Sequence, residues 1–369
     1  MRLEEYLKKG KTYIIAEMSG NHGGSLKRAL DIVHEAARAG ADCLKTQTYT
    51  ADTLTINCHK DAFLLGGGLW DRSYLYDLYE KAYTPWEWMP VIKAEAEKCG
   101  MDFLSTPFDD SAVDFLDGIG EEFYKIASFE LVDIPLIRKA AKTGKPLVIS
   151  CGMGSVEEIQ EAVDTVHAAG NGKLVLLKCC SAYPTDYGAM HLQTIRDMQD
   201  RFHVPVGLSD HSEGSLADIA AVTLGACVIE KHFCISKTDN TVDSAFSLDK
   251  DEFAAMVRDV RNTERALGRG ASGISYGPSK DEAQSYSLRR SLYVVKDIRK
   301  GEAFTLDNLR SIRPSGGLHT RYLDVLTGTG SYEGKEPKRA ARDLFFGDPL
   351  REEDVEGAAD LFEGLPDRK

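Results

Sequence analysis

The stretch "VPVGLSDHS" (residues 204–212) joins an apolar run to a polar end. Its first half predicts a short buried strand, which ends in Ser209, Asp210 and His211. Because side chains alternate along a strand, the serine and the histidine share one face. The stretch "CVIEKHF" (227–233) has the same design. Polar residues at the carboxyl ends of buried strands are typical of a parallel barrel, where they build the active site.

Short apolar runs of this kind recur along the first 270 residues. Eight strands are predicted, at 13–17, 42–47, 102–107, 123–128, 146–151, 174–180, 204–210 and 227–233. Between them, amphipathic patterns predict helices, the clearest at 25–40, 86–100, 155–170 and 251–268. Eight strands that alternate with helices favour an α/β fold, a (β/α)8 TIM barrel. A doubly wound parallel sheet is the alternative.

The alternation stops near residue 270. Residues 1–270 form the predicted barrel domain, and 271–287, rich in glycine, serine and polar residues, form a linker. Short strand patterns and a "KG" turn predict a second, small domain at 288–350. The remaining residues, 351–369, are expected to be a frayed tail.

The composition is that of a globular protein, with 369 residues, 43% of them hydrophobic, and a net charge of −13. This charge argues against nucleic acid or an anionic membrane as a partner, but a small anion remains compatible with it. The eight cysteines form no Cys-x-x-Cys pair, the N-terminus lacks the apolar core of a signal peptide, and no apolar run approaches 18 residues. We therefore expect a cytoplasmic protein with reduced thiols.

Polar residues cluster at the predicted strand ends. They are Glu17, Lys45, Gln47, Thr106, Lys125, Ser128, Ser150, Lys178, Ser181, Ser209, His211, Glu230 and His232. A lysine within an apolar strand is costly to desolvate unless it has an anionic partner. Lys45, Lys125 and Lys178 therefore either pair with carboxylates of neighbouring strands or bind a small, multiply charged anion. The accompanying hydroxyl donors favour the anion, such as a phosphate or carboxylate.

His211 and His232 end consecutive predicted strands, so their imidazoles can converge. The nearby carboxylates are those of Glu17, Asp210, Glu230 and Asp243. Such a mixed nitrogen and oxygen set suits Mn²⁺, Co²⁺, Fe²⁺ or Zn²⁺. His22, just after the first strand, is either a third participant or a residue that shapes its loop.

Other motifs have less chemical content. His34, in a helical pattern, is expected to be structural. Cys179 and Cys180 have no evident base in the sequence, which favours buried packing over nucleophilic chemistry. The segment "GGGLWDR" (66–72) lies in the long connection after the second strand and is predicted to cover the substrate as a lid.

Several of these segments resemble the signature motifs of the sialic acid synthase family, in the same order. They are "IIAEMSGNHGG", "LKTQTY", "STPFD", "YKIAS", "PLVISCGM", "SAYPT", "GLSDHSEG" and "VIEKHF". The later "RRSLYVVKDIRKGEAFTLDNLRSIRP" resembles the family's C-terminal antifreeze-like (SAF) domain. The resemblance covers about residues 10–350. Within the family, "GGGLWD", "LLKCCSAYPT" and "RPSGGL" are most similar to the pseudaminic acid branch.

The resemblance implies condensation of phosphoenolpyruvate with an amino-sugar aldose to a nine-carbon 2-keto acid, with release of phosphate. For the pseudaminic acid branch the sugar is 2,4-diacetamido-2,4,6-trideoxy-L-altrose. An N-acetylneuraminate or legionaminate synthase is the alternative, although Lys178 and Ser181 replace a histidine and an asparagine of the neuraminate branch. More distant alternatives are a metal-dependent aldolase or hydrolase without phosphoenolpyruvate, and a non-catalytic carbohydrate-binding protein.

The resemblance also implies roles for single residues. Glu17 positions the attacking water, and His211 and His232 hold a divalent metal, expected to be Mn²⁺, with Mg²⁺ or Co²⁺ as alternatives. The phosphoenolpyruvate site is expected to comprise Lys45, Thr106, Lys125, Ser128, Ser150, Ser181 and Ser209. The expected sugar contacts are Gln47, Glu130, Tyr183, Asp243 and Arg313, with Glu230 near the sugar or the metal. Arg313 reaches from the small domain of one subunit into the barrel of the other in a domain-swapped homodimer.

Overall fold

The computed structural model describes residues 2–67, 70–269 and 273–358. The chain divides into two compact units, Met1–Ile274 and Ser275–Lys369. No helix within the described ranges is both long and apolar enough to cross a membrane.

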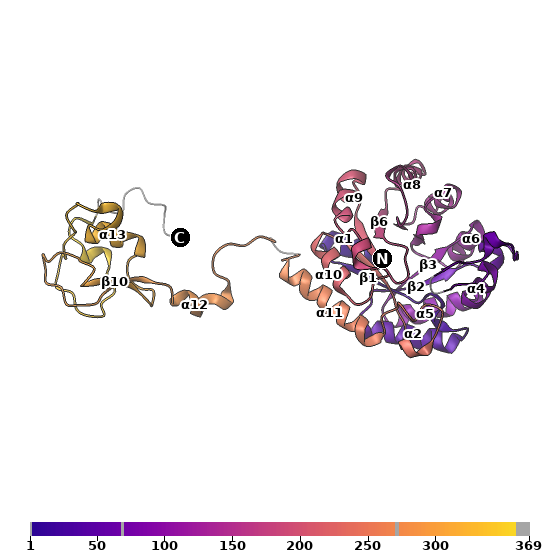
Figure 1. The fold of residues 1–369 in the computed structure, drawn as a ribbon, viewed down its shortest axis with the longest axis horizontal. Coiled ribbons are helices and arrows are strands. Elements are labelled where there is room, and N and C mark those ends of the chain that lie inside the picture. Colours follow the sequence, from indigo (N-terminus) through magenta and orange to yellow (C-terminus); the bar gives the residue numbers. More distant parts are fainter. Residues whose placement is uncertain (1, 68–69, 270–272, 359–369) are drawn as a thin grey trace. The chain divides into compact units, whose positions relative to one another are not determined.

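The first unit is a closed barrel of eight parallel strands in sequential order (Figure 1). The strands are β1 Tyr13–Glu17, β2 Cys43–Thr48, β3 Asp102–Pro107, β4 Tyr124–Ile126, β5 Leu147–Ser150, β6 Leu174–Cys179, β7 Val206–Asp210 and β8 Val228–His232. Strand β1 pairs with both β2 and β8, which closes the sheet. The predicted (β/α)8 barrel is therefore confirmed, and the open doubly wound sheet is excluded.

Helices surround the strands, as Figure 1 shows. They are α1 Arg2–Lys9, α2 Leu26–Ala39, α3 Ala51–Leu54, α4 Leu75–Ala82, α5 Met89–Lys98, α6 Asp110–Gly118, α7 Ile134–Lys142, α8 Val156–Ala168, α9 Thr194–Phe202, α10 Leu216–Thr223 and α11 Lys250–Ala266. Local signals fix their ends. Ser155 and Glu158 form a capping box at the start of α8, and Gly40, with φ 90°, ends α2.

Two separate apolar clusters hold the barrel together. The larger lies between strands and helices, and the smaller fills the barrel interior with Leu3, Tyr13, Ile15, Cys43, Leu104, Phe123, Val148, Val175, Leu177 and Val228. Leu3 belongs to α1, so this helix closes the amino-terminal end of the barrel. At Gly207 on β7, a Cβ atom would lie 2.4 Å from the Val228 carbonyl oxygen, so the interior is too tightly packed there for a side chain.

The second unit contains two short antiparallel strands, β9 Ser291–Val294 and β10 Leu309–Ile312, and two short helices, α12 Ala283–Ser287 and α13 Leu323–Thr327. A cluster of buried apolar residues forms its core: Leu292, Val294, Ile298, Phe304, Leu309, Leu318, Tyr322, Leu326, Ala340, Leu344, Leu350 and Val355.

Two features of the second unit differ from the predicted boundaries. Helix α12 lies inside the predicted linker 271–287. Val355 is buried and bridges to Ala340, so packed structure continues past residue 350, where the tail was expected to begin. The elements of this unit are short and irregular, so no strong periodicity marks their boundaries in the sequence.

Candidate active site

The inner face of the barrel changes from apolar to polar at the carboxyl end of its strands. Glu17 follows Tyr13 and Ile15 at two-residue spacing, and Lys125 follows Phe123 in the same way. The other inward polar side chains at this end are Lys45, Gln47, Thr106, Ser150, Ser209, Glu230 and His232. Since the amino-terminal end is closed by α1, these residues form the floor of the open end.

Lys178 is on the opposite face. It lies between Leu177, which belongs to the interior cluster, and Cys179, and its Nζ donates to the Cys179 carbonyl oxygen at 3.0 Å. The prediction that Lys178 joins Lys45 and Lys125 in one pocket is therefore wrong.

Asp210 also points outward. It pairs with the buried Lys231, and its Oδ1 accepts from the Ser212 backbone N–H at 2.7 Å. Lys231 donates to the Ser212 carbonyl oxygen at 2.7 Å. The sequence suggested that Asp210 is one of the carboxylates near the two histidines, and this prediction is wrong because its side chain faces away from the barrel interior. Instead, it fixes the turn that carries His211.

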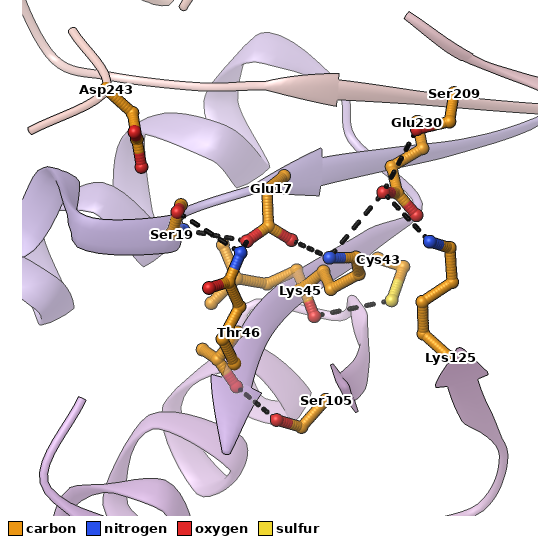
Figure 2. A network of polar contacts seen from close by, with 12 residues as sticks. Glu17, Ser19, Cys43, Lys45, Thr46, Ser105, Lys125, Ser209, Glu230 and Asp243 are labelled. Carbon is orange, nitrogen blue, oxygen red and sulfur yellow. Dashed lines mark hydrogen bonds and ion pairs between the residues drawn. The ribbon is translucent and has the colours of Figure 1, made fainter. Parts of the chain in front are cut away.

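Two lysines and two glutamates form a buried ionic cluster (Figure 2). Lys45 contacts Glu17, and its Nζ lies 3.5 Å from Glu230 Oε1. Lys125 Nζ lies 3.4 Å from the same oxygen. All four residues are at most 5% exposed. The predicted pairing with a carboxylate of the neighbouring strand is therefore present for Lys45, which contacts Glu17 on β1, whereas the partner of Lys125 lies on β8, across the barrel from β4.

The two glutamates of this cluster differ in acidity. Burial raises the pKa of Glu17, and the negative charge of Glu230 adds to the shift, while Lys45 opposes it. For Glu230, burial also disfavours the ionised form, but Lys125 and Lys45 outweigh it and lower the pKa. Of the two, Glu17 is therefore the carboxyl that holds a proton more readily.

Short contacts fix the orientation of Glu17. Its Oε1 accepts from Gln47 Nε2 at 3.1 Å and from the Ser19 backbone N–H at 3.0 Å. Ser19 has φ 46°, a strained backbone for a non-glycine residue, and it begins a 3-10 helix, Ser19–His22. The next backbone N–H, of Gly20, donates to Asp243 Oδ2 at 3.3 Å. Gln47, Glu17 and Asp243 are thus held by the same turn.

Hydroxyl groups without partners lie beside the lysines. Thr106 Oγ1 and Ser150 Oγ are buried and have no hydrogen-bond partner among the described residues. Ser209 Oγ makes a long contact of 3.5 Å to Glu230 Oε1. Buried polar groups are normally satisfied, so unpaired donors next to buried cations indicate a place for an oxyanion.

Gly152 brings two further hydroxyls together. Its backbone N–H donates to Ser128 Oγ at 3.1 Å. A Cβ atom on Gly152 would lie 2.4 Å from Ser181 Oγ and 2.8 Å from Ser128 Oγ. Only glycine leaves room for both serines at this strand end, directly after β5.

The two histidines fit a metal ion. Their ring centroids are 5.3 Å apart. His211 Nδ1 lies 3.0 Å from the Cys180 carbonyl oxygen, which leaves its Nε2 for another ligand. His232 Nδ1 is buried and has no partner among the described residues. Burial and the positive charges nearby lower the pKa of His232, so its ring is neutral and able to bind a cation.

In the described ranges, three metal-binding side chains lie close together only at His34, Glu95 and Cys99, on or beside the outer helices α2 and α5. There, Glu95 already accepts from His34 Nε2 and from Lys98 Nζ, each at 2.9 Å. This cluster is satisfied without an ion.

His22 is a loop residue. Its Nε2 lies 3.1 Å from Thr84 Oγ1, its Nδ1 accepts from the Gly24 backbone N–H at 3.1 Å, and its ring packs against Trp88. With both ring nitrogens occupied, His22 shapes the loop after β1 and does not reach the site as a ligand.

Aromatic rings border the histidines. Tyr183 lies 4.4 Å from His211 and Phe246 lies 4.8 Å from His232, measured between ring centroids. Trp70 packs on Tyr183 at 5.8 Å. Trp70 comes from the predicted lid, of which residues 68 and 69 lie outside the described ranges. Phe246 was missed because it lies in an irregular loop whose sequence carries no periodic signal.

Cys179 is buried, as predicted, but it also faces the site, which the sequence did not indicate. Its Sγ lies 3.9 Å from His211 Nδ1 and 3.8 Å from Ser181 Oγ. Burial alone raises the pKa of this thiol, but the interaction with His211 outweighs burial and lowers the pKa to about 7. Its two-residue spacing from Leu177 was the available signal.

Two predicted sugar contacts remain. The Glu130 carboxyl has one buried, unpartnered oxygen, and burial raises its pKa to about 7. Arg313 is exposed and belongs to the second unit, so its relation to this site is a prediction.

Comparisons with known proteins agree with this site. The NeuB family model matches residues 32–272, and the SAF domain model matches residues 289–356. A protein named pseudaminic acid synthase from Campylobacter jejuni subsp. jejuni serotype O:23/36 (strain 81-176) is 45% identical, over 93% of this chain and 96% of that protein. The N,N'-diacetyllegionaminic acid synthase of C. jejuni serotype O:2 is 34% identical, over 88% and 98%.

A solved structure is similar as well. The crystal structure of N-acetylneuraminic acid (sialic acid) synthetase from Leptospira borgpetersenii serovar Hardjo-bovis, in complex with citrate, matches with a TM-score of 0.65 and 30% identity, over 74% of this chain and 90% of that one. With a closed barrel, a SAF domain and relatives similar along nearly its whole length, the chain belongs to the NeuB family.

Proposed function

We propose that this chain is a pseudaminic acid synthase, which converts phosphoenolpyruvate, 2,4-diacetamido-2,4,6-trideoxy-L-altrose and water into pseudaminic acid and phosphate. The observation that carries the proposal is the pairing of two features at one barrel end: buried lysines with unpartnered hydroxyls, and two neighbouring histidines. The relative named pseudaminic acid synthase, at 45% identity, supports this sugar over that of the legionaminic acid synthase, at 34%.

The proposed phosphoenolpyruvate site consists of the lysines and the hydroxyls around them. Its members are Lys45, Thr106, Lys125, Ser128, Ser150, Ser181 and Ser209. Without ligand, the charges of the two lysines are balanced by Glu17 and Glu230. A phosphate and a carboxylate therefore need further compensation. A proton on Glu17 and a bound divalent cation each supply some of it.

The chemistry then follows from the position of Glu17. C3 of phosphoenolpyruvate forms a bond to the aldehyde carbon of the sugar, whose oxygen takes the proton of Glu17, and C2 becomes an oxocarbenium. A water held by the resulting Glu17 carboxylate adds to C2 and returns a proton to Glu17. The tetrahedral intermediate then expels phosphate, which leaves with the proton of the new C2 hydroxyl, and the keto group forms. Lys45 and Lys125 offset the phosphate charge throughout, in a site shielded from water.

A divalent cation, expected to be Mn²⁺, would be held by His211 and His232. Bound there, it supplies Lewis acidity toward the aldehyde oxygen of the sugar. The unpartnered Nδ1 of His232 supports this assignment. We assign the sugar to Gln47, Glu130, Tyr183 and Asp243.

We also propose a domain-swapped homodimer, in which Arg313 of one subunit contacts the sugar in the barrel of the other. Charge supports this arrangement. Residues 288–350 contain 12 lysines and arginines against eight acidic residues, whereas residues 1–274 contain 29 against 41. Arg289, Arg290 and Arg321 line a hollow of about 710 Å³ on the small unit. The basic excess of residues 288–350 and an acidic barrel attract each other across two copies, although the whole second unit, residues 275–369, has 16 basic and 17 acidic residues. The free cysteines support the expected cytoplasmic location.

The first experiment is phosphate release from phosphoenolpyruvate with Mn²⁺, using the trideoxy-altrose diacetamide and N-acetylmannosamine side by side, with mass spectrometry of the products. Release with the altrose sugar alone supports the proposal. Release with N-acetylmannosamine instead would move the chain to the neuraminate alternative, and no release with any aldose would favour the non-catalytic one. Glu17→Gln is the matched control, expected to bind phosphoenolpyruvate without turnover.

Mixing two inactive variants tests the dimer. If Arg313 acts across subunits, Arg313→Ala mixed with Glu17→Gln forms heterodimers with one intact site, and equal amounts recover about a quarter of wild-type activity. If Arg313 acts within its own subunit, both sites of the heterodimer are defective and the mixture stays inactive.

A further inference from the structure

Trp70 lies within reach of the proposed sugar site. It belongs to the long connection between β2 and β3, and its ring is 5.8 Å from Tyr183 and 6.3 Å from Phe246. These two rings in turn contact His211 and His232. Trp70 is thus one ring removed from the histidines, at an aromatic wall formed by Trp70, Tyr183 and Phe246.

This wall is not an extension of the barrel core. The two apolar clusters that hold the barrel together do not include any of its three rings. Trp70 is only half-buried as a residue, and it is held by ring contacts rather than by aliphatic packing. A role in binding therefore does not compete with a role in folding.

The indole N–H of Trp70 makes no hydrogen bond within the part of the chain that the structure describes. Nε1 is buried and has no hydrogen-bond acceptor among the described residues. A tryptophan has this single donor, and buried donors are normally paired. Trp86 shows the usual case, since its Nε1 donates to the Tyr49 carbonyl oxygen at 3.1 Å. The unpaired donor at the edge of a reaction site indicates a hydrogen bond that forms only with a ligand.

The chemistry of the wall restricts that ligand. Three aromatic faces favour methyl groups, and the one N–H donates to a single carbonyl oxygen. A sugar hydroxyl placed against the same rings can accept from the indole N–H, but its own O–H finds no acceptor on the ring faces. An acetamido group provides both a methyl and a carbonyl, and a deoxy carbon adds a second methyl.

We propose that Trp70 determines sugar specificity, because its ring packs on methyl groups of the sugar and its Nε1–H donates to an acetamido carbonyl oxygen. It thereby selects a deoxygenated, N-acylated aldose over a polyhydroxylated one. This inference rests on the proposed function, and it adds a residue to the sugar site outside the set expected from the sequence.

Steady-state kinetics of Trp70→Phe test the inference, because this variant keeps an aromatic ring and removes the N–H. With the trideoxy-altrose diacetamide, we expect KM for the sugar to rise about 5- to 10-fold, the effect of one lost hydrogen bond. The KM for phosphoenolpyruvate should stay unchanged. Trp70→Ala should raise the sugar KM further and reduce the preference, in kcat/KM, for this sugar over N-acetylmannosamine. Trp86→Phe is the matched control and should leave both KM values unchanged.

The outcomes separate the inference from the proposed function. If the wild-type protein turns over the altrose sugar and Trp70→Phe has the same sugar KM, the inference is wrong and the function stands. An equal rise of both KM values would also overturn it, because that indicates general distortion of the site. A wild-type protein that uses only N-acetylmannosamine would overturn both.

Discussion

Replacing Lys125 by methionine would remove one positive charge from the buried cluster of two lysines and two glutamates. Lys125 is 2% exposed, and its Nζ lies 3.4 Å from Glu230 Oε1. Lys45 would then be the remaining cation for Glu17 and Glu230. Breaking a buried ion pair by removing one partner costs about 3–5 kcal/mol, and since burial lowers the pKa of Lys125 itself, the lower end applies here. For a domain of this size, a loss of 3 kcal/mol lowers Tm by roughly 6–12 °C.

The effect should depend on pH in a defined direction. Lys125 helps to lower the pKa of Glu230 in the folded protein, so its removal raises that pKa. In the wild type the folded pKa of Glu230 is lowered, so its contribution to stability is present above the unfolded pKa and is lost as pH falls. Because Lys125→Met loses part of this contribution, the Tm difference from wild type should shrink as pH falls through the range in which carboxyl groups take up protons.

The double variant Lys125→Met/Glu230→Gln is the control. It removes both charges of the pair, so its Tm should exceed that of Lys125→Met, although phosphoenolpyruvate turnover stays lost. Calorimetry or circular dichroism at several pH values measures all variants. Two results would show that the cluster is not the coupled ionic unit described above. One is a Lys125→Met variant that melts at the wild-type temperature. The other is a double variant whose loss in Tm equals the sum of the losses of Lys125→Met and Glu230→Gln.

Three further predictions concern single side chains. Gly152→Ala places a methyl group where Ser128 and Ser181 meet. We therefore expect the KM for phosphoenolpyruvate to rise at least tenfold in phosphate-release kinetics, while Tm changes little. An unchanged KM would show that the two serines are not part of the phosphoenolpyruvate site. Burial raises the pKa of Glu130 to about 7, so the free energy of unfolding of the wild type should fall by about 2–3 kcal/mol as pH rises from 5 to 8. Glu130→Gln, measured by thermal denaturation, should lack this loss. Parallel pH profiles of the two proteins would contradict the prediction. His232→Ala should abolish Mn²⁺ binding in calorimetric titration and metal-dependent turnover, and normal rates in the metal-free variant would show that the metal assignment is wrong.

The barrel and most of its inward strand ends were predictable because they depend on local patterns. Glu17 and Lys125 end strands whose earlier residues alternate clearly between interior and helix-facing positions. Strand β6, "LVLLKC", is apolar on both faces, as is common in parallel barrels. Its sequence therefore does not indicate which side chains face the barrel interior. As a result, Lys178 was assigned inward in place of Cys179.

The aromatic wall could not be predicted for another reason. Trp70 and Phe246 come from loops that are distant in sequence, and their meeting beside Tyr183 depends on the tertiary fold. A sequence pattern can mark such a loop as long or unusual, which is how residues 66–72 were selected. It does not specify which of its side chains turns toward the site.

The stretch "SDH" at the end of β7 shows how both faces of one strand serve the same site. Ser209 and His211 face inward, toward Glu230 and the second histidine. Asp210 faces outward, where its contact with Lys231 and the bonds of both residues to Ser212 fix the backbone on either side of His211. A metal ligand must be held within about 0.5 Å of its working position, which a free loop does not achieve. The buried Lys231–Asp210 pair therefore acts on the site through the backbone. Its charges hold the turn around His211 in place and do not contact the substrate.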